Sequence, residues 1–288
     1  MDFGNVLTAM VTPFDVHGEI DFEKTDELIE HLLKNGSDGL VVAGTTGESP
    51  TLTNEEKQSL FRHIVKTVNG RVPVIAGTGS NDTAASMSLT KEAEFSGVDG
   101  IMLVTPYYNK PNPKGLYSHF ETIANATALP VMLYNVPGRT AVKMDADTII
   151  QLSHINNIVA VKEASGDLNQ VVDIIQQTSR DFRIYSGEDN ITLPMLSVGA
   201  DGVVSVAAHI VGTNLQTMVH AYQSGDVNKS ASIHRHLLPL MNGLFNQPSP
   251  APVKAALRMN GIDVGSVRLP LVELTESEKE ALKNVMIE

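Results

Sequence analysis

A lysine follows directly after a short apolar run, in the segment Ile158 to Lys162. The run is typical of a strand that is buried in the protein interior. Burying an ammonium group without a partner is costly, and the usual relief is that the group loses its proton. A neutral amine is a nucleophile that attacks carbonyl groups. The position of Lys162 therefore favours a Schiff-base lysine.

Two other roles would explain the same lysine. It could form an ion pair with an acid such as Glu163, or extend its ammonium group to solvent along an apolar stem. Successive side chains on a strand point to opposite faces, so Glu163 is a poor partner for its neighbour. Strand alternation therefore favours a Schiff-base role for Lys162, and the other two roles stay open.

Hydroxyl groups and turn-forming glycines follow another apolar run, in the segment GTTGES at residues 44 to 49. Gly44 and Gly47 allow a tight turn that presents backbone N–H groups to a small anion, with the hydroxyls of Thr45 and Thr46 beside them. The spacing is not that of a P-loop. An ordinary turn with a threonine cap explains the segment equally well.

Two further segments carry groups that could act on a substrate. Tyr134 ends an apolar run and precedes a glycine-containing loop with Arg139, while Tyr107 and Tyr108 lie in the proline-rich segment TPYYNKPNP. Arginine binds carboxylates through two parallel hydrogen bonds. The alternatives are a surface ion pair for the arginine, and surface packing or a subunit contact for the tyrosine pair.

These groups all follow apolar, largely β-branched runs, which predict strands that are buried on both faces, as in parallel sheets. The eight runs span residues 6–11, 39–44, 72–77, 100–105, 130–135, 158–162, 183–187 and 202–206. Amphipathic stretches between them predict helices at residues 21–36, 53–70, 81–97, 115–127, 145–155, 168–179 and 190–199. Thr53 with Glu56 is a capping-box pattern at the start of the second of these helices.

Alternating strands and helices imply a parallel sheet with helices outside it, and eight such units that close on themselves form the α/β fold called a (β/α)8 or TIM barrel. The rival is an open doubly wound sheet, whose G-x-G-x-x-G fingerprint is missing after the first strand. We expect the barrel, which carries the active site, over residues 1–225 and a C-terminal helical extension over residues 226–288. Catalytic residues of a barrel gather where its strands end.

The composition excludes several classes of function. The chain has 288 residues, no cysteine and a net charge of −12. Disulfides, zinc–thiolate sites and cysteine nucleophiles are therefore excluded, and binding to nucleic acid or to a membrane is disfavoured. Without a long apolar run or a basic leader, we expect a cytoplasmic protein.

The histidines give little sign of a metal site. His234 and His236 lie two residues apart in an expected helix, where they face apart, so we expect no metal ion. His31, His63 and His119 are expected on the solvent side of their helices.

Five motifs together resemble the family of dihydrodipicolinate synthases, also called 4-hydroxy-tetrahydrodipicolinate synthases. They are, in order, GTTGES, TPYYNKP, YNVPGRT, KEASGD and RLPL. The resemblance extends from VLTAMVTPF near the start to RLPLVEL near the end, so it covers nearly the whole chain. The family belongs to the pyruvate-dependent class I aldolases, a superfamily of lyases that also includes N-acetylneuraminate lyase.

The resemblance implies a reaction in lysine and diaminopimelate biosynthesis, in which pyruvate condenses with L-aspartate 4-semialdehyde without a dissociable cofactor. It implies that Lys162 forms an imine with pyruvate, and that Thr45, Tyr134 and Tyr108 form a hydrogen-bonded proton relay. In the family the second tyrosine of the pair completes the site of a neighbouring subunit. The usual assembly is a homotetramer, and some members are dimers.

The resemblance also implies how the substrates are held. Thr46 and its backbone N–H would bind the pyruvate carboxylate, and Arg139 would guide the carboxylate of the semialdehyde. Gly187 and Val204 would line the pocket.

Two other functions remain. The first is a pyruvate-releasing sugar-acid aldolase such as N-acetylneuraminate lyase, although Arg139 and the doubled threonine favour the synthase. The second is a non-catalytic barrel that only binds a ligand, against which the presence of Lys162, Tyr134 and Thr45 argues.

Many members of the family are inhibited by lysine bound at a subunit interface. Ser49, Asn81 and Tyr107 match that pocket. Ala85 stands where inhibited members often carry a glutamate, and Asn54 and Lys57 stand where many inhibited bacterial members carry histidines. A missing anion and an added cation both disfavour a cationic ligand. Weak or absent feedback by lysine is therefore expected.

Overall fold

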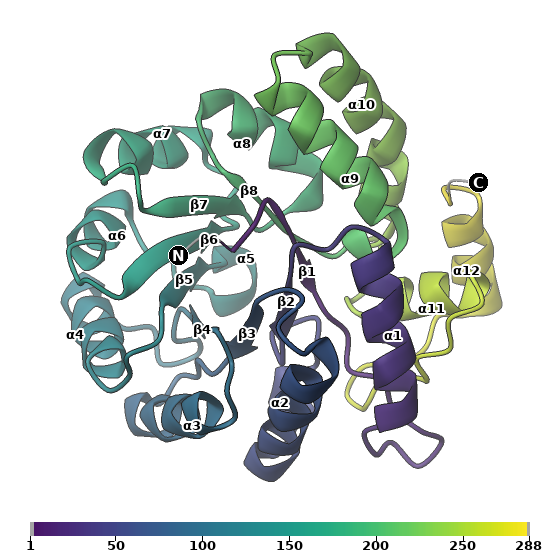
Figure 1. Ribbon diagram of the computed structural model, residues 1–288, viewed down its shortest axis with the longest axis horizontal. Coiled ribbons are helices and arrows are strands. Elements are labelled where there is room, and N and C mark those ends of the chain that lie inside the picture. The colour runs from purple at the N-terminus through teal and green to yellow at the C-terminus, as the bar shows by residue number, and fades with distance from the viewer. Residues whose placement is uncertain (1–2, 287–288) are drawn as a thin grey trace.

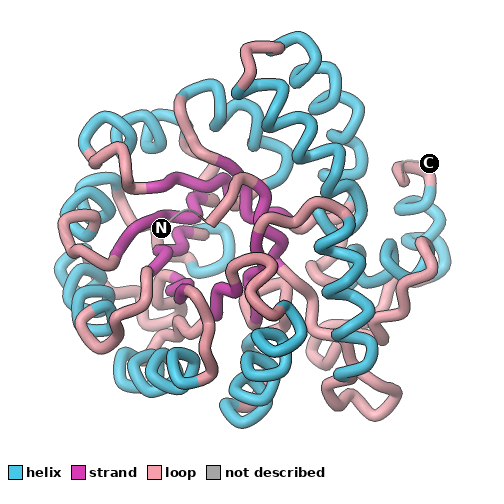
Figure 2. Tube along the Cα trace, in the orientation of Figure 1, coloured by secondary structure: helices cyan, strands magenta, loops and turns pink. Residues whose placement is uncertain are grey.

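The computed structural model describes residues 3–286 and places eight parallel strands in a closed ring with helices outside it (Figure 1, Figure 2). The strands are β1 (Val6–Ala9), β2 (Gly39–Val42), β3 (Val74–Gly77), β4 (Gly100–Val104), β5 (Val131–Asn135), β6 (Ile158–Glu163), β7 (Arg183–Ser186) and β8 (Gly202–Ser205). Each lies within one of the predicted runs or ends one residue beyond it. The runs predict the strands well because a strand that is buried on both faces consists almost entirely of apolar residues. The predicted (β/α)8 barrel is confirmed.

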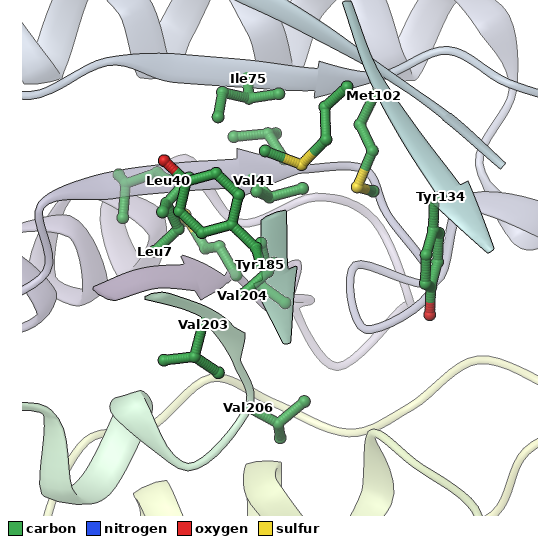
Figure 3. Packing of buried hydrophobic residues seen from close by; sticks show 14 of the residues in the cluster. Leu7, Leu40, Val41, Ile75, Met102, Tyr134, Tyr185, Val203, Val204 and Val206 are labelled. Atoms are coloured by element: carbon green, nitrogen blue, oxygen red, sulfur yellow. The ribbon is translucent and has the colours of Figure 1, made fainter. Parts of the chain in front are cut away.

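The barrel interior is a packed core and not a channel. All strand residues except Val104, Val159 and Arg183 are buried. Tyr185 fills part of this core, and its hydroxyl donates to the carbonyl of Gly4 at 2.9 Å. Figure 3 shows the apolar side chains gathered around that ring. A filled interior leaves only the end of the barrel, where the strands terminate, free to hold a substrate.

The helices that cover the barrel follow the predicted stretches closely. They are α1 (Phe22–Lys34), α2 (Asn54–Val68), α3 (Thr83–Phe95), α4 (Pro113–Ala124), α6 (Ala146–Leu152), α7 (Leu168–Gln177) and α8 (Thr192–Val198). The predicted capping box is confirmed, since Thr53 and Glu56 exchange side-chain and backbone hydrogen bonds at the start of α2. Helix α9 (Ala208–Gln223), which lies outside the predicted stretches, completes the eighth unit.

Within the described residues, three helices follow the barrel: α10 (Val227–Gly243), α11 (Ala251–Met259) and α12 (Glu276–Lys283). In Figure 1 they run from α9 along one side of the barrel towards the C-terminus, with α10 beside α9. The division of the chain at residue 225 stays a prediction. Among residues 3–286, none of the helices is long and apolar enough to cross a membrane.

His119 does not lie on the solvent side of its helix, contrary to the expectation from the sequence. Its side chain is only 6 % exposed, and its Nδ1 lies 2.8 Å from the hydroxyl of Thr83 on the neighbouring helix α3. Burial lowers the pKa of His119 to about 4, so the ring is neutral at pH 7. The apolar stripe of α4 includes this position because α3 and α4 pack side by side.

His209 is completely buried where β1 and β8 end. Its Nε2 accepts from the backbone N–H of Val11 at 3.1 Å, so its Nδ1 carries the proton and donates to the carbonyl of Val206 at 2.8 Å. Burial lowers the pKa of His209 to about 4. Protonation would remove the acceptor for Val11 and place a charge in the core.

We expect the free energy of unfolding to fall as the pH is lowered from 6.5 towards 4. Between these pH values His209 is protonated in the unfolded state and neutral in the folded state. Lowering the pH therefore favours the unfolded state. Between pH 7.5 and pH 5 the contribution of His209 is about 2 kcal/mol. Urea unfolding of wild type and His209→Gln at both pH values measures it, and the variant should show a pH dependence smaller by that amount. Equal pH dependence in the two proteins would contradict this assignment.

Candidate active site

Lys162 and Tyr134 lie side by side where β6 and β5 end. The two residues are paired in the parallel ladder, so their side chains point to the same face of the sheet. Lys162 Nζ lies 4.3 Å from the centre of the Tyr134 ring, and the side chains are 5 % and 4 % exposed. Figure 3 shows Tyr134 apart from the packed core around Tyr185. The strands thus hold an amine and a phenol together at the mouth of the barrel.

An irregularity in the ladder creates this pairing. Val131 pairs with Ile158, but the next residue, Met132, pairs with Ala160, so Val159 is an extra residue in β6. Without this bulge the regular register would place Val161 opposite Tyr134. Bulges occur often beside active sites, where they re-aim side chains. The bulge is what brings Lys162 level with the tyrosine.

Glu163 is no partner for Lys162, as expected from strand alternation. Its carboxylate is 1 % exposed and accepts hydrogen bonds from Asn135 Nδ2 at 2.9 Å, Gln170 Nε2 at 3.0 Å and the backbone N–H of Ser165 at 2.7 Å. Burial raises the pKa of Glu163, against the effect of these donors. Within residues 3–286 no carboxylate forms an ion pair with Lys162, so its amine is available to a substrate.

The threonine loop, residues Gly44–Ser49, supplies free backbone donors beside the lysine. The N–H groups of Thr45, Thr46 and Gly47 donate to no acceptor in the described part of the chain, whereas those of Glu48 and Ser49 donate back to Thr45 and Gly44. Thr46 is 5 % exposed. Adjacent unpaired N–H groups form a concave site for an anion.

A cavity of about 720 Å³, here called the Lys162 cavity, opens at this end of the barrel. Six of the predicted site residues line it: Thr45, Thr46, Tyr134, Arg139, Lys162 and Gly187. Gly187 has no room for a side chain, since an added Cβ would lie 2.6 Å from Ala164 Cβ and 3.2 Å from Lys162 Cε. Arg139 lies on a one-turn helix, α5 (Pro137–Thr140), rather than in the expected loop, because Pro137 starts a helical turn there.

Two predicted site residues lie elsewhere. Tyr108 is 89 % exposed, has a positive φ of 71° and lines neither cavity of this site. Val204 is 1 % exposed within β8 and is also absent from the lining, where Val206 appears instead. The hydroxyls of Thr45 and Tyr134 line the same cavity, yet they form no hydrogen bond with each other in the described structure.

The rest of the Lys162 cavity comes from residues that the sequence did not single out. Glu188, Asp189 and Asn190 follow β7, while Asn242 and Asn246 come from the end of α10 and the loop after it. The C-terminal extension therefore forms part of the site. Glu188, Asp189 and Asn190 could have been predicted, because they directly follow a strand of the barrel. No local sequence pattern indicates that residues of α10 reach the barrel mouth.

The threonine loop is also anchored by the C-terminal extension. The Glu48 carboxylate is buried and lies 2.7 Å from Lys254 Nζ of α11, while its other oxygen accepts from the backbone N–H of Arg268 at 2.8 Å. Glu48 has a positive φ of 57°, a backbone conformation that the surrounding contacts must hold in place. On the other side, the Thr12 hydroxyl donates to the carbonyl of Gly47 at 2.7 Å.

A second cavity of about 420 Å³, here called the Lys57 cavity, adjoins the first and shares Thr45, Tyr134 and Arg139 with it. Lys57 and Tyr107 line it, and none of the acidic residues that the structure describes does. Burial lowers the pKa of Lys57.

Among residues 3–286, no three histidine, aspartate or glutamate side chains lie close enough to hold a metal ion.

The sequence matches the profile of the Dihydrodipicolinate synthetase family over residues 2–288. A 4-hydroxy-tetrahydrodipicolinate synthase of Bacillus subtilis is 61 % identical over 289 residues, which cover 100 % of both chains. The crystal structure of dihydrodipicolinate synthase from Bacillus anthracis has a TM-score of 0.98 at 56 % identity and covers 99 % of this chain and 98 % of that one. The lysine-bound enzyme of Cyanidioschyzon merolae has a TM-score of 0.97 at 48 % identity, with 98 % and 97 % covered. The chain belongs to the dihydrodipicolinate synthetase family.

Proposed function

We propose that this chain condenses pyruvate with L-aspartate 4-semialdehyde to 4-hydroxy-tetrahydrodipicolinate, in lysine and diaminopimelate biosynthesis, through an imine on Lys162. It is a lyase of the pyruvate-dependent class I aldolase type. The observation that carries the assignment is the buried Lys162 amine. It has no acidic partner in the described part of the chain and lies 4.3 Å from the centre of the Tyr134 ring at the mouth of a cavity.

The chemistry follows from the amine. Lys162 Nζ attacks the keto carbon of pyruvate, and loss of water leaves an iminium. The iminium withdraws electrons, so a proton leaves the pyruvate methyl group and an enamine forms. The enamine carbon then bonds to the aldehyde carbon, and the aldehyde oxygen takes up a proton. The amino group of the former aldehyde, once it has lost its proton, attacks the imine carbon, which closes the ring and releases the Lys162 amine. The imine itself stabilises the charge, so the reaction needs no dissociable cofactor.

Hydroxyl groups move the protons in this sequence. Tyr134 lies against Lys162 Nζ, and Thr45 lines the same cavity, so both can donate and accept protons near the imine. Tyr108 is the third member of the relay and acts in the site of a neighbouring subunit. Its 89 % exposure in the single chain supports that role. The assembly is then a homo-oligomer, a dimer or a tetramer.

Fixed donors hold the two carboxylates. The free N–H groups of the threonine loop and the Thr46 hydroxyl bind the carboxylate of pyruvate, and Arg139 binds that of the semialdehyde. Gly187 keeps space beside Lys162 Cε for the imine. Val204 lies within β8 in the packed core near Tyr185, so a direct contact with substrate is not part of the proposal.

The test is reductive trapping. Incubation with pyruvate and borohydride, followed by peptide mass mapping, should place the adduct on Lys162. An adduct on another residue, or none, would remove the proposed mechanism. Supplying pyruvate with different aldehydes then separates the synthase, which uses L-aspartate 4-semialdehyde, from a sugar-acid aldolase.

Lysine at sub-millimolar concentration is expected to leave the activity unchanged. The lysine-bound Cyanidioschyzon merolae enzyme shows that relatives hold this ligand. Among the described residues, the Lys57 cavity is lined by the cations Lys57 and Arg139 and by no acid, so a further ammonium group would be repelled. Initial rates with and without lysine measure the effect. Half-inhibition below about 1 mM, a concentration that corresponds to about −4 kcal/mol of binding free energy, would refute the prediction.

A further inference from the structure

One carboxylate of the Lys162 cavity has no partner among the residues that the structure describes. Glu188 follows β7, is half-buried and lines the cavity. Its carboxylate forms neither a hydrogen bond nor an ion pair within residues 3–286. Neither Arg139 nor Lys162, the two cationic residues of the lining, is close enough to pair with it.

The two neighbouring acids are already satisfied. Glu163 accepts three hydrogen bonds on the far side of β6. Asp189 is 3 % exposed and accepts from the hydroxyl of Ser205 and from the backbone N–H groups of Val206 and Ala207 at 3.0 and 2.9 Å. These two carboxylates are fixed by the protein, so Glu188 is the acid that remains available to a ligand.

The surroundings make Glu188 receptive to a cation. Burial, then the nearby charges of Glu163 and Asp189, raise the pKa of Glu188. A positive group placed against it would be attracted by all three carboxylates. Because water is partly excluded at this depth, the attraction is stronger than at the protein surface.

The charges of the cavity match those of the two substrates when Glu188 is included. The threonine loop takes the carboxylate of pyruvate, Lys162 becomes the imine, and Arg139 takes the carboxylate of the aldehyde. The aldehyde also carries an α-ammonium group, for which these residues offer no acceptor. We propose that Glu188 binds the α-ammonium group of the aldehyde and so selects an amino-acid aldehyde over one that lacks the amino group. This inference rests on the proposed function.

Succinic semialdehyde tests the proposal, since it has the same chain, aldehyde and carboxylate but no amino group. Pyruvate consumption is followed with each aldehyde for wild type and for Glu188→Gln, which keeps the size of the side chain and removes its charge. We expect kcat/KM for L-aspartate 4-semialdehyde to fall about 10- to 100-fold, as for loss of a charged hydrogen bond. The value for succinic semialdehyde should change by less than about threefold. If the second aldehyde is not turned over, its inhibition constant replaces kcat/KM.

Two further measurements separate recognition from a structural role. Glu188→Asp keeps the charge and should retain part of the preference for the amino-acid aldehyde, while borohydride trapping with pyruvate should be unchanged in both variants. An equal loss with both aldehydes, or a loss of trapping, would overturn the role of Glu188. Wild-type protein that traps no pyruvate would instead overturn the proposed function, so the two failures are distinguishable.

Discussion

Replacing Lys162 with alanine is expected to lower kcat/KM for the condensation by about 10⁴-fold or more and to abolish trapping of pyruvate by borohydride. Lys162 is the one lysine among the described residues that line the Lys162 cavity. Without it, pyruvate can still enter, but no amine is in place to form the imine. The steady-state rate and the mass of the borohydride-treated protein measure the two effects.

Two control variants make this result specific. Lys162→Arg keeps a positive charge but offers a guanidinium that stays protonated, so it should be as inactive as the alanine variant. Lys143→Ala removes a lysine whose side chain is 46 % exposed and pairs with Asp167 at 2.8 Å, and its activity should stay within about twofold of wild type. An active Lys162→Ala variant would mean that the reaction does not pass through an imine at this residue.

The sequence predicted the fold and the reactive lysine for the same physical reason. Strands that are buried on both faces must be apolar throughout, so each could be recognised from a short segment. A lysine at the end of such a strand is conspicuous because burying a charge there is costly. Lys162, Tyr134 and the threonine loop could be predicted in this way, because each lies at the end of an apolar run or directly after it.

Other parts of the site depend on contacts that a local pattern cannot express. The extra residue Val159 brings Lys162 level with Tyr134, yet the segment reads as a regular strand. The amides of Asn242 and Asn246 reach the cavity only because α10 packs beside α9 and η2 (Asp189–Ile191). Glu188 differs from Glu163 and Asp189 in having no hydrogen-bond or ion-pair partner among the described residues, and this difference depends on the tertiary structure.

The anchor between the threonine loop and α11 is a further example, because Glu48 and Lys254 are far apart in the sequence. Both side chains are 1 % exposed, and Lys254 Nζ also donates to the carbonyl of Ser266 at 2.7 Å. Burial lowers the pKa of Lys254 to about 8, so desolvation outweighs the attraction of Glu48. A buried ion pair of this kind adds little stability compared with a neutral pair, but each partner depends on the other.

Lys254→Met is therefore expected to lower the free energy of unfolding by about 3 to 5 kcal/mol, because it leaves the Glu48 carboxylate buried without its cation. Adding Glu48→Gln should restore most of this loss, since no unpaired charge then remains in the core. Urea unfolding of the single and double variants measures both changes.

Arg258→Met is the matched control in the same helix, because it removes an ion pair with Glu273 whose side chains are 31 % and 42 % exposed. That exposed pair should contribute less than about 1 kcal/mol. If Lys254→Met were as mild as the control, the threonine loop would not depend on the C-terminal extension for its position.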